Sequence, residues 1–207
     1  RHTRYISVTG VQTCALPIFS SSASVYGIPK RLPVNELDPK DPISPYGNTK
    51  HMTELILRDY CRAYGINSVC FRYFNAAGAE PFNYDLGQEP GATHIVARVL
   101  EASLAGRAFT INGDDYSTPD GTCVRDYVHV WDIATAHVKA STFIDSITDE
   151  NTTALSLVFN LGTNAGVSNK QIVDYVKGRY GLSFVNFGPR RAGDPDELVA
   201  DAHTAEE

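Results

Sequence analysis

Apolar residues after position 18 recur in two alternating patterns, short runs typical of strands and longer stretches with helical spacing. Strands are predicted at residues 19–22, 66–75, 109–111, 124–130, 156–162 and 182–187. Helices are predicted at residues 46–64, 94–106, 131–143 and 168–180. This alternation predicts a layered α/β domain with a mostly parallel sheet.

The helix predicted at residues 46–64 has the clearest boundaries. Ser44 is a good amino-terminal cap, and Pro45 suits the first helical position because its missing N–H is not needed there. Gly65 is expected to end the helix. Two long loops, residues 76–93 and 112–122, lie further along the chain, and loops of this length usually carry function.

Composition describes an ordinary globular chain of 207 residues, 43% hydrophobic and 20% charged. The net charge of -6 and the lack of a basic stripe argue against nucleic acid as a partner. No apolar run is long enough to cross a bilayer, so we expect no membrane partner either.

Of the four cysteines, Cys14 belongs to the first 18 residues, which are considered separately below. The other three, Cys61, Cys70 and Cys123, are too widely spaced for a zinc pair and too few for a disulfide framework. We expect them to be buried thiols in a reducing cytoplasm. The histidines His51, His129 and His137 are isolated in the sequence, and we predict no metal site.

Residues 1–18 do not follow the α/β pattern. They resemble a signal peptide, but Thr13 and Pro17 interrupt the apolar run. They also resemble the opening strand of a dinucleotide-binding turn, but no further glycine follows Gly10. The stretch VTGVQTCALPI is more similar to a translated sequencing adapter, so we interpret residues 1–18 as a non-native segment.

Two short segments predict a proton-transfer site. Ser22 is expected at a strand end, and Tyr46 and Lys50 are four residues apart, so their side chains share one helix face. The positive end of the helix and the ammonium of Lys50 both favour the phenolate form of Tyr46. Such a group can take a proton from a hydroxyl that is losing hydride. The alternative is that the pair has no catalytic role, with Tyr46 a core tyrosine and Lys50 a solvated lysine.

With these residues the chain resembles the UDP-glucose 4-epimerase family within the extended short-chain dehydrogenase/reductase superfamily. The resemblance rests on stretches that follow in family order and span nearly everything after residue 18: SSSASVYG, SPYGNTKHMTE, RYFNAAGAEP, LGQEPGATHI, DDYSTPDGTCVRDYVHVWDIA, FNLGT and PRRAGDPDELVADA. It implies a Rossmann-like, doubly wound parallel sheet with a smaller carboxyl-terminal substrate-binding domain.

The resemblance also implies NAD as cofactor and UDP-sugars as substrates, epimerised at carbon 4 through a transient 4-keto sugar. Tyr46 would remove the proton of the 4-hydroxyl, Lys50 would hold the nicotinamide ribose, and Ser22 would bond the 4-oxygen. Tyr73 would lie near the nicotinamide.

Further residues are implied to bind the substrate. Arg125 and Arg191 are forked donors suited to diphosphate oxygens, with an ordinary surface arginine as the alternative. By similarity, Asn75 would contact the diphosphate or sugar. His94 would donate to the diphosphate, with a helix-start cap as the alternative. The remaining residues implied to contact the uridine are Thr110, Asn112 and Asp194.

The glycine-rich pyrophosphate turn of the superfamily is missing from this sequence. We therefore expect residues 19–75 to form the second half of an NAD-binding domain, and residues 76–207 to form a substrate-binding region interleaved with its last elements. As a fragment cut short at both ends, the chain alone is expected to be inactive and not to retain NAD. The full-length protein is expected to be a cytoplasmic homodimer.

Related activities stay open. A UDP-pentose 4-epimerase would use the same residues. A UDP-glucuronate decarboxylase of the same fold is a further rival. A 4,6-dehydratase is less favoured, because an acidic pair beside the serine is expected there and Ser22 is followed by Ala23 and Ser24. Leu198 stands where some relatives have a large aromatic residue, which leaves the acceptance of N-acetylated sugars open. An inactive fragment that at most binds a nucleotide is the alternative from another class.

Overall fold

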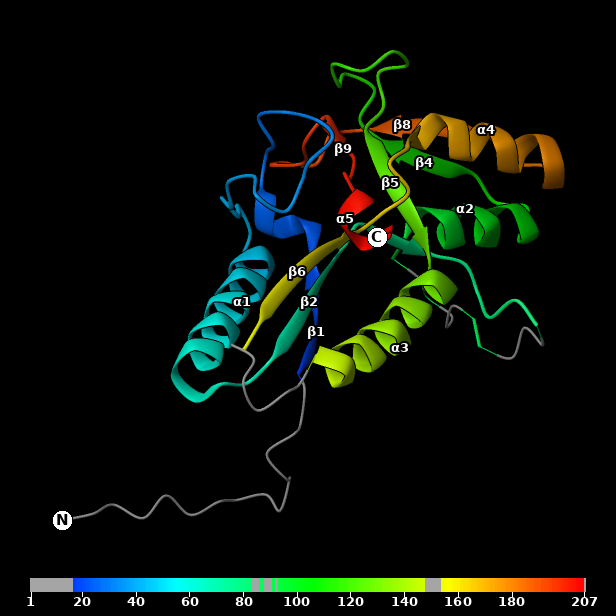
Figure 1. Ribbon diagram of the computed structural model, residues 1–207. Helices are drawn as coiled ribbons and strands as arrows, with labels where there is room; N and C mark the ends of the chain where they lie inside the picture. The colour runs from blue at the N-terminus through cyan, green and yellow to red at the C-terminus, as the bar shows by residue number, and fades with distance from the viewer. Residues whose placement is uncertain (1–16, 83–85, 88–90, 92, 148–153, 207) are drawn as a thin grey trace.

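Helices and strands alternate through the computed structural model, which describes residues 17–82, 86–87, 91, 93–147 and 154–206 (Figure 1). The strands are β1 Ile18–Ser22, β2 Ser68–Tyr73, β3 Asn75–Ala77, β4 Phe109–Asn112, β5 Val124–His129, β6 Ser156–Leu161, β7 Gly166–Ser168, β8 Val185–Gly188 and β9 Glu197–Leu198. The helices are the 3-10 turn η1 Ala23–Tyr26, α1 Pro45–Tyr64, α2 Ile95–Leu104, α3 Val130–Ile147, α4 Asn169–Tyr180 and α5 His203–Glu206.

One layer of the molecule is a parallel sheet with the order β1-β2-β6. Helix α1 lies along one side of this sheet and α3 along the other (Figure 1). The α3 face is apolar, because buried Phe71 and Leu161 of the sheet pack with Ala140 and Ile144 of the helix. Within the described part of the chain, β1 pairs on one side only, so its outer edge is open.

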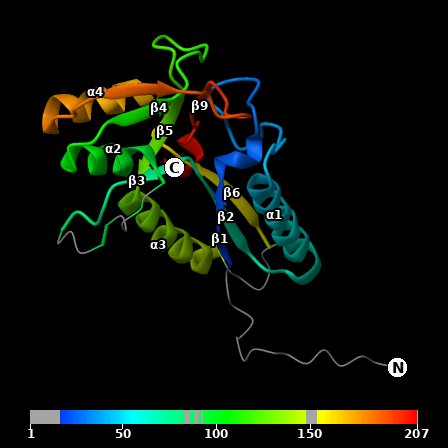
Figure 2. The ribbon, with the colours of Figure 1, turned by 180° about the vertical axis from the view of Figure 1, so that it is seen from behind.

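The rest of the chain builds a second group of strands beside this layer (Figure 2). Strand β5 pairs with β3 and β9 in parallel and with β7 antiparallel, and β4 pairs with β8. Helices α2 and α4 pack together over β4, with buried Val99, Ile111 and Val173 between them. The mixed α/β architecture with parallel sheets agrees with the predicted fold class.

The predicted ends of α1 are confirmed. The Ser44 hydroxyl accepts from the Gly47 N–H at 3.0 Å, and Pro45 opens the helix. Gly65 adopts φ 68°, a left-handed conformation that favours glycine. Ser168 caps α4 with a full capping box to Gln171.

Three short strands were not predicted, and their absence from the prediction has a physical reason. Strand β3 starts at Asn75, the last residue of the predicted strand at 66–75, because β2 ends at Tyr73 and the chain then pairs with a different partner, β5. Strands β7 and β9 have only a few residues each and are defined by pairing with β5. Helix α3 also runs past residue 143.

The buried thiols are also confirmed: Cys61, Cys70 and Cys123 are free and buried. Among the described residues no helix is long and apolar enough to cross a membrane. Residues 1–16, most of the segment interpreted as non-native, lie outside the described residues. Ile18, its last residue, pairs with Val69 as the first residue of β1, and backbone pairing of this kind does not depend on the side chain.

Candidate active site

Tyr46 and Lys50 lie together in the first turns of α1, at the open edge of β1. The Lys50 ammonium donates to the Ser20 carbonyl at 2.7 Å and lies 5.4 Å from the centroid of the Tyr46 ring. Tyr46 is 56% exposed, so its phenol can reach a bound molecule. The spacing therefore places both side chains on one helix face, as predicted.

Ser22 is the last residue of β1. The turn η1 that follows it packs against α1. Its hydroxyl oxygen accepts from the N–H of Ser24 at 3.2 Å and from the Ser24 hydroxyl at 3.0 Å. Helix α1 comes very close here, because a Cβ on Gly47 would lie 2.6 Å from the Ser24 carbonyl oxygen. The glycine next to Tyr46 thus permits the close approach of α1 to η1, the turn that follows Ser22.

Tyr73 extends this group across the sheet. Its hydroxyl lies 2.8 Å from Ser20 Oγ and 2.9 Å from His137 Nε2, and His137 Nδ1 lies 2.8 Å from the Ile133 carbonyl. Since that carbonyl can only accept, Nδ1 carries a proton and donates to it. In the Nδ1–H tautomer, Nε2 accepts from the Tyr73 hydroxyl, which leaves Ser20 to donate to Tyr73. Helix α3 thus brings His137 to Tyr73, a residue 64 positions away in the sequence.

Burial keeps Tyr73 a neutral donor. Desolvation raises the pKa of its phenol, and the nearby Tyr46 acts in the same direction, whereas the Ser20 hydrogen bond acts against them. The phenol of Tyr73 therefore stays protonated and acts as a hydrogen-bond donor near Tyr46, not as a base.

A second group of predicted residues lines one cavity of about 200 Å³. Seven of the eight residues predicted to bind substrate contribute to its wall: Asn75, His94, Thr110, Asn112, Arg125, Arg191 and Asp194. Ser22 is the one that does not line it. These seven come from β3, the start of α2, β4, β5 and the 191–194 loop, so the cavity belongs to the second group of strands and its helices.

The cavity is positively charged although the chain is acidic overall. Three arginines and one aspartate line it, which leaves two net positive charges with His94 neutral. Burial raises the pKa of Cys123 and Tyr127 in its wall, so neither adds negative charge near neutral pH. An anionic ligand is the natural occupant of such a site.

Several of these side chains hold one another. Arg125 Nη2 donates to Asp194 Oδ1 at 2.6 Å and to the Pro195 carbonyl at 2.8 Å. With its amide oxygen turned toward Arg191, Asn112 accepts from Nε at 3.2 Å and Nη2 at 3.3 Å. Part of the donor capacity predicted for a ligand is thus used to fix the wall.

The two groups are joined through the chain itself. Asn75 lines the cavity and donates to the Asp126 carbonyl at 2.8 Å, and Tyr73 of the first group is two residues earlier. His94 caps α2 without a side-chain capping hydrogen bond, so its ring is not used as a cap, the alternative considered for it.

Sequence reasoning missed other residues of the cavity wall. Arg98 on α2 and Asn169 at the start of α4 line it, and neither belongs to a recognisable motif. The spacing of Arg98 four residues after His94 was the available signal, because helical residues at this spacing share a face.

A buried ion pair between Arg72 of β2 and Glu54 of α1 joins the helix to the sheet. Arg72 donates from Nε to Glu54 Oε1 at 2.9 Å and from Nη2 to Oε2 at 2.7 Å, and the two residues are 3% and 7% exposed. Ser21 Oγ adds a bond to Glu54 at 2.5 Å. Burial acts to raise the pKa of Glu54, but the bonds and charge of Arg72 outweigh it and lower that pKa.

The residues at the edge of β1 fit one end of a dinucleotide. The Lys50 ammonium uses one described acceptor and keeps donors for ribose hydroxyls, while Tyr46 and Ser20 are exposed. Lys50, Tyr46 and the backbone near Tyr73 are therefore the groups that could hold a nicotinamide ribose.

A parallel sheet between helices, with a Tyr-Lys pair at its edge and a cationic cavity beside it, defines a Rossmann-like α/β protein. The sequence matches the NAD dependent epimerase/dehydratase family over residues 4–162. The chain belongs to this family.

Individual relatives agree with the resemblance. The chain is 46% identical over 191 residues to a UDP-glucose 4-epimerase of Lactobacillus helveticus, covering 91% of this chain and 56% of that protein. It superposes on the UDP-glucose 4-epimerase of Brucella ovis in complex with NAD with a TM-score of 0.79 at 42% identity, covering 91% of this chain and 57% of that one.

A further solved structure is that of the Bifidobacterium longum UDP-glucose 4-epimerase with NAD+ and UDP. The TM-score is 0.78 at 37% identity, covering 91% of this chain and 56% of that chain. The chain thus spans a little over half the length of the relatives it matches.

Proposed function

We propose that the whole protein interconverts UDP-sugars, UDP-glucose and UDP-galactose, by inverting carbon 4 with NAD as cofactor. The observation that carries this proposal is the cationic cavity, whose wall contains seven residues that the family resemblance implies bind a nucleotide sugar. Its two net positive charges suit a diphosphate. The Tyr46 and Lys50 pair supplies the acid-base group that the reaction needs.

Each residue has a role that its surroundings support. Tyr46 takes the proton from the sugar's 4-hydroxyl oxygen and later returns it, and the Lys50 ammonium lies 5.4 Å from the centroid of its ring. Ser22 orients the 4-oxygen by a hydrogen bond. NAD, when bound, supplies the acceptance and return of hydride. Lys50 also holds the ribose of that cofactor, and Tyr73 lies beside it.

Binding of the nucleotide falls to the cavity. The positive charges of Arg125 and Arg191 neutralise the diphosphate. His94 donates a hydrogen bond to the diphosphate, and Asn75 contacts the diphosphate or sugar. The remaining contacts, to the uridine, are made by Thr110, Asn112 and Asp194. Tight binding of this end leaves the sugar free to present either face to the Tyr46 group.

We also propose that residues 19–75, with α3 and β6, form part of the NAD-binding domain and that the rest forms the substrate-binding region. A homodimer through the outer face of α1 is supported by its exposed Met52, Ile56 and Tyr64. Three free, buried cysteines favour a reducing compartment, the cytoplasm.

Binding of UDP to the chain tests the cavity directly. Isothermal titration should detect UDP binding, and Arg191→Ala should weaken it by about tenfold to a hundredfold, since a hydrogen bond to a charged group contributes roughly 1.5–3 kcal/mol. Arg179→Ala, an exposed arginine on α4, is the matched control and should leave affinity unchanged. Failure of the unaltered chain to bind UDP, or equal affinity in Arg191→Ala, would contradict the assigned site.

A further inference from the structure

Tyr116 is buried although it belongs to the long loop between β4 and β5. It is 4% exposed, and its backbone N–H donates to the Gly121 carbonyl at 3.0 Å. Gly113 makes room for the ring: it has φ 85°, and a Cβ there would lie 2.4 Å from Tyr116 Cε2. This loop is therefore folded around the tyrosine, which points inward.

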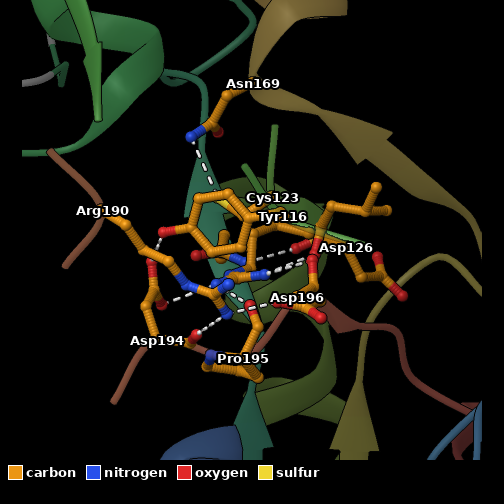
Figure 3. A network of polar contacts seen from close by, with 11 residues as sticks. Tyr116, Cys123, Asp126, Asn169, Arg190, Asp194, Pro195 and Asp196 are labelled. Carbon is orange, nitrogen blue, oxygen red and sulfur yellow. Dashed lines mark hydrogen bonds and ion pairs between the residues drawn. The ribbon is translucent and has the colours of Figure 1, made fainter. Parts of the chain in front are cut away.

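The hydroxyl of Tyr116 reaches Asp194 in the cavity wall (Figure 3). It donates to Asp194 Oδ2 at 3.2 Å, while Arg125 Nη2 donates to Oδ1 at 2.6 Å. The two carboxylate oxygens thus have different donors from different elements, which fixes the orientation of the carboxylate. Burial, followed by the charge of Asp194, raises the pKa of Tyr116 to about 12, so it remains a donor at neutral pH.

The ring of Tyr116 also contacts the 190–196 loop, which carries Asp194. The guanidinium of Arg190 lies 4.1 Å from the ring centroid, a cation–π arrangement. Arg190 also bonds the Asp194 carbonyl and the Asp196 carboxylate (Figure 3). Its neighbour Arg191 turns instead toward Asn112 and lines the cavity.

We propose that Tyr116 is a positioning residue of the nucleotide site: its hydroxyl orients the Asp194 carboxylate for a nucleoside diphosphate, and its ring holds the 190–196 loop that presents Arg191. This inference rests on the proposed function, because it concerns the same cavity. Tyr116 does not itself line the cavity, so it acts through Asp194 and Arg190.

Titration of the chain with UDP tests the hydroxyl alone. Tyr116→Phe keeps the ring over Arg190 and removes one donor, and UDP affinity should fall about threefold to tenfold, the range for one hydrogen bond. Tyr175→Phe, an exposed tyrosine on α4, is the control and should bind UDP as the unaltered chain does.

A double-mutant cycle separates positioning from simple loop support. In an Asp194→Ala background, Tyr116→Phe should change UDP affinity by less than twofold, because the hydroxyl has lost the group through which it acts. Should Asp194→Ala fail to fold, Asp194→Asn replaces the acceptor that faces the tyrosine and should likewise remove most of the effect.

Each outcome decides something. Unchanged affinity in Tyr116→Phe, or the same loss in both backgrounds, overturns the positioning role and leaves the proposed function intact. Absence of UDP binding by the unaltered chain overturns the proposed function, and the positioning role with it.

Discussion

Tyr46→Phe should lower the rate of UDP-sugar interconversion by the whole protein about a hundredfold to ten-thousandfold, the range that a positioned acid-base group contributes. Phenylalanine keeps the ring beside Lys50 but has no oxygen to take the proton of the 4-hydroxyl. Since Tyr46 is 56% exposed, the change removes no buried packing and should leave the fold intact. Initial rates with UDP-galactose measure the effect.

The matched control for Tyr46 is on the same helix. Tyr60 is 52% exposed and four turns further along α1, so Tyr60→Phe should retain normal turnover. UDP affinity should persist in Tyr46→Phe, because Tyr46 does not line the cationic cavity. Normal turnover in Tyr46→Phe would show that the proton is taken elsewhere.

Arg72→Met should destabilise the chain by roughly 3–5 kcal/mol, because it leaves the carboxylate of Glu54 buried without its partner. Tyr26 also loses a donor, since Arg72 Nη1 lies 2.8 Å from its hydroxyl. Urea unfolding measures the change. Arg58→Met, on the exposed side of α1, should shift stability by no more than about 0.5 kcal/mol.

The pH dependence gives the same ion pair a second readout. Glu54 has a folded pKa below its ordinary value of 4.5, so its contribution is fully present above pH 4.5 and is lost as the pH falls through the lower folded pKa. In Arg72→Met, burial favours the neutral carboxyl instead. The stability difference between the two proteins should therefore narrow at acid pH, and a difference independent of pH would contradict the ion-pair explanation.

Local signals predicted the parts of the fold that depend on a few neighbouring residues. Helix α1 begins after Ser44 with Pro45 and ends at Gly65, as expected, because capping and the left-handed conformation are set within one helical turn. The break at Phe74 could not be predicted, since nothing in the apolar run indicates that β3 leaves β2 to pair with β5.

The candidate site divides in the same way. Pairing of Tyr46 with Lys50 follows from helical spacing, whereas the cavity residues were reached through a family resemblance. Contacts such as Arg125 with Asp194, 69 residues apart, and Tyr116 with Asp194, 78 residues apart, depend on how distant loops meet. Periodicity and composition carry no information about such meetings.

The most direct measurement is to incubate the whole protein with UDP-galactose and NAD and to follow the configuration at carbon 4 by proton NMR. We predict that UDP-glucose appears until equilibrium is reached, with no net reduction of NAD. Formation of a 4-keto-6-deoxy sugar, turnover restricted to UDP-pentoses, or no conversion by protein that binds both UDP and NAD would contradict the proposed reaction.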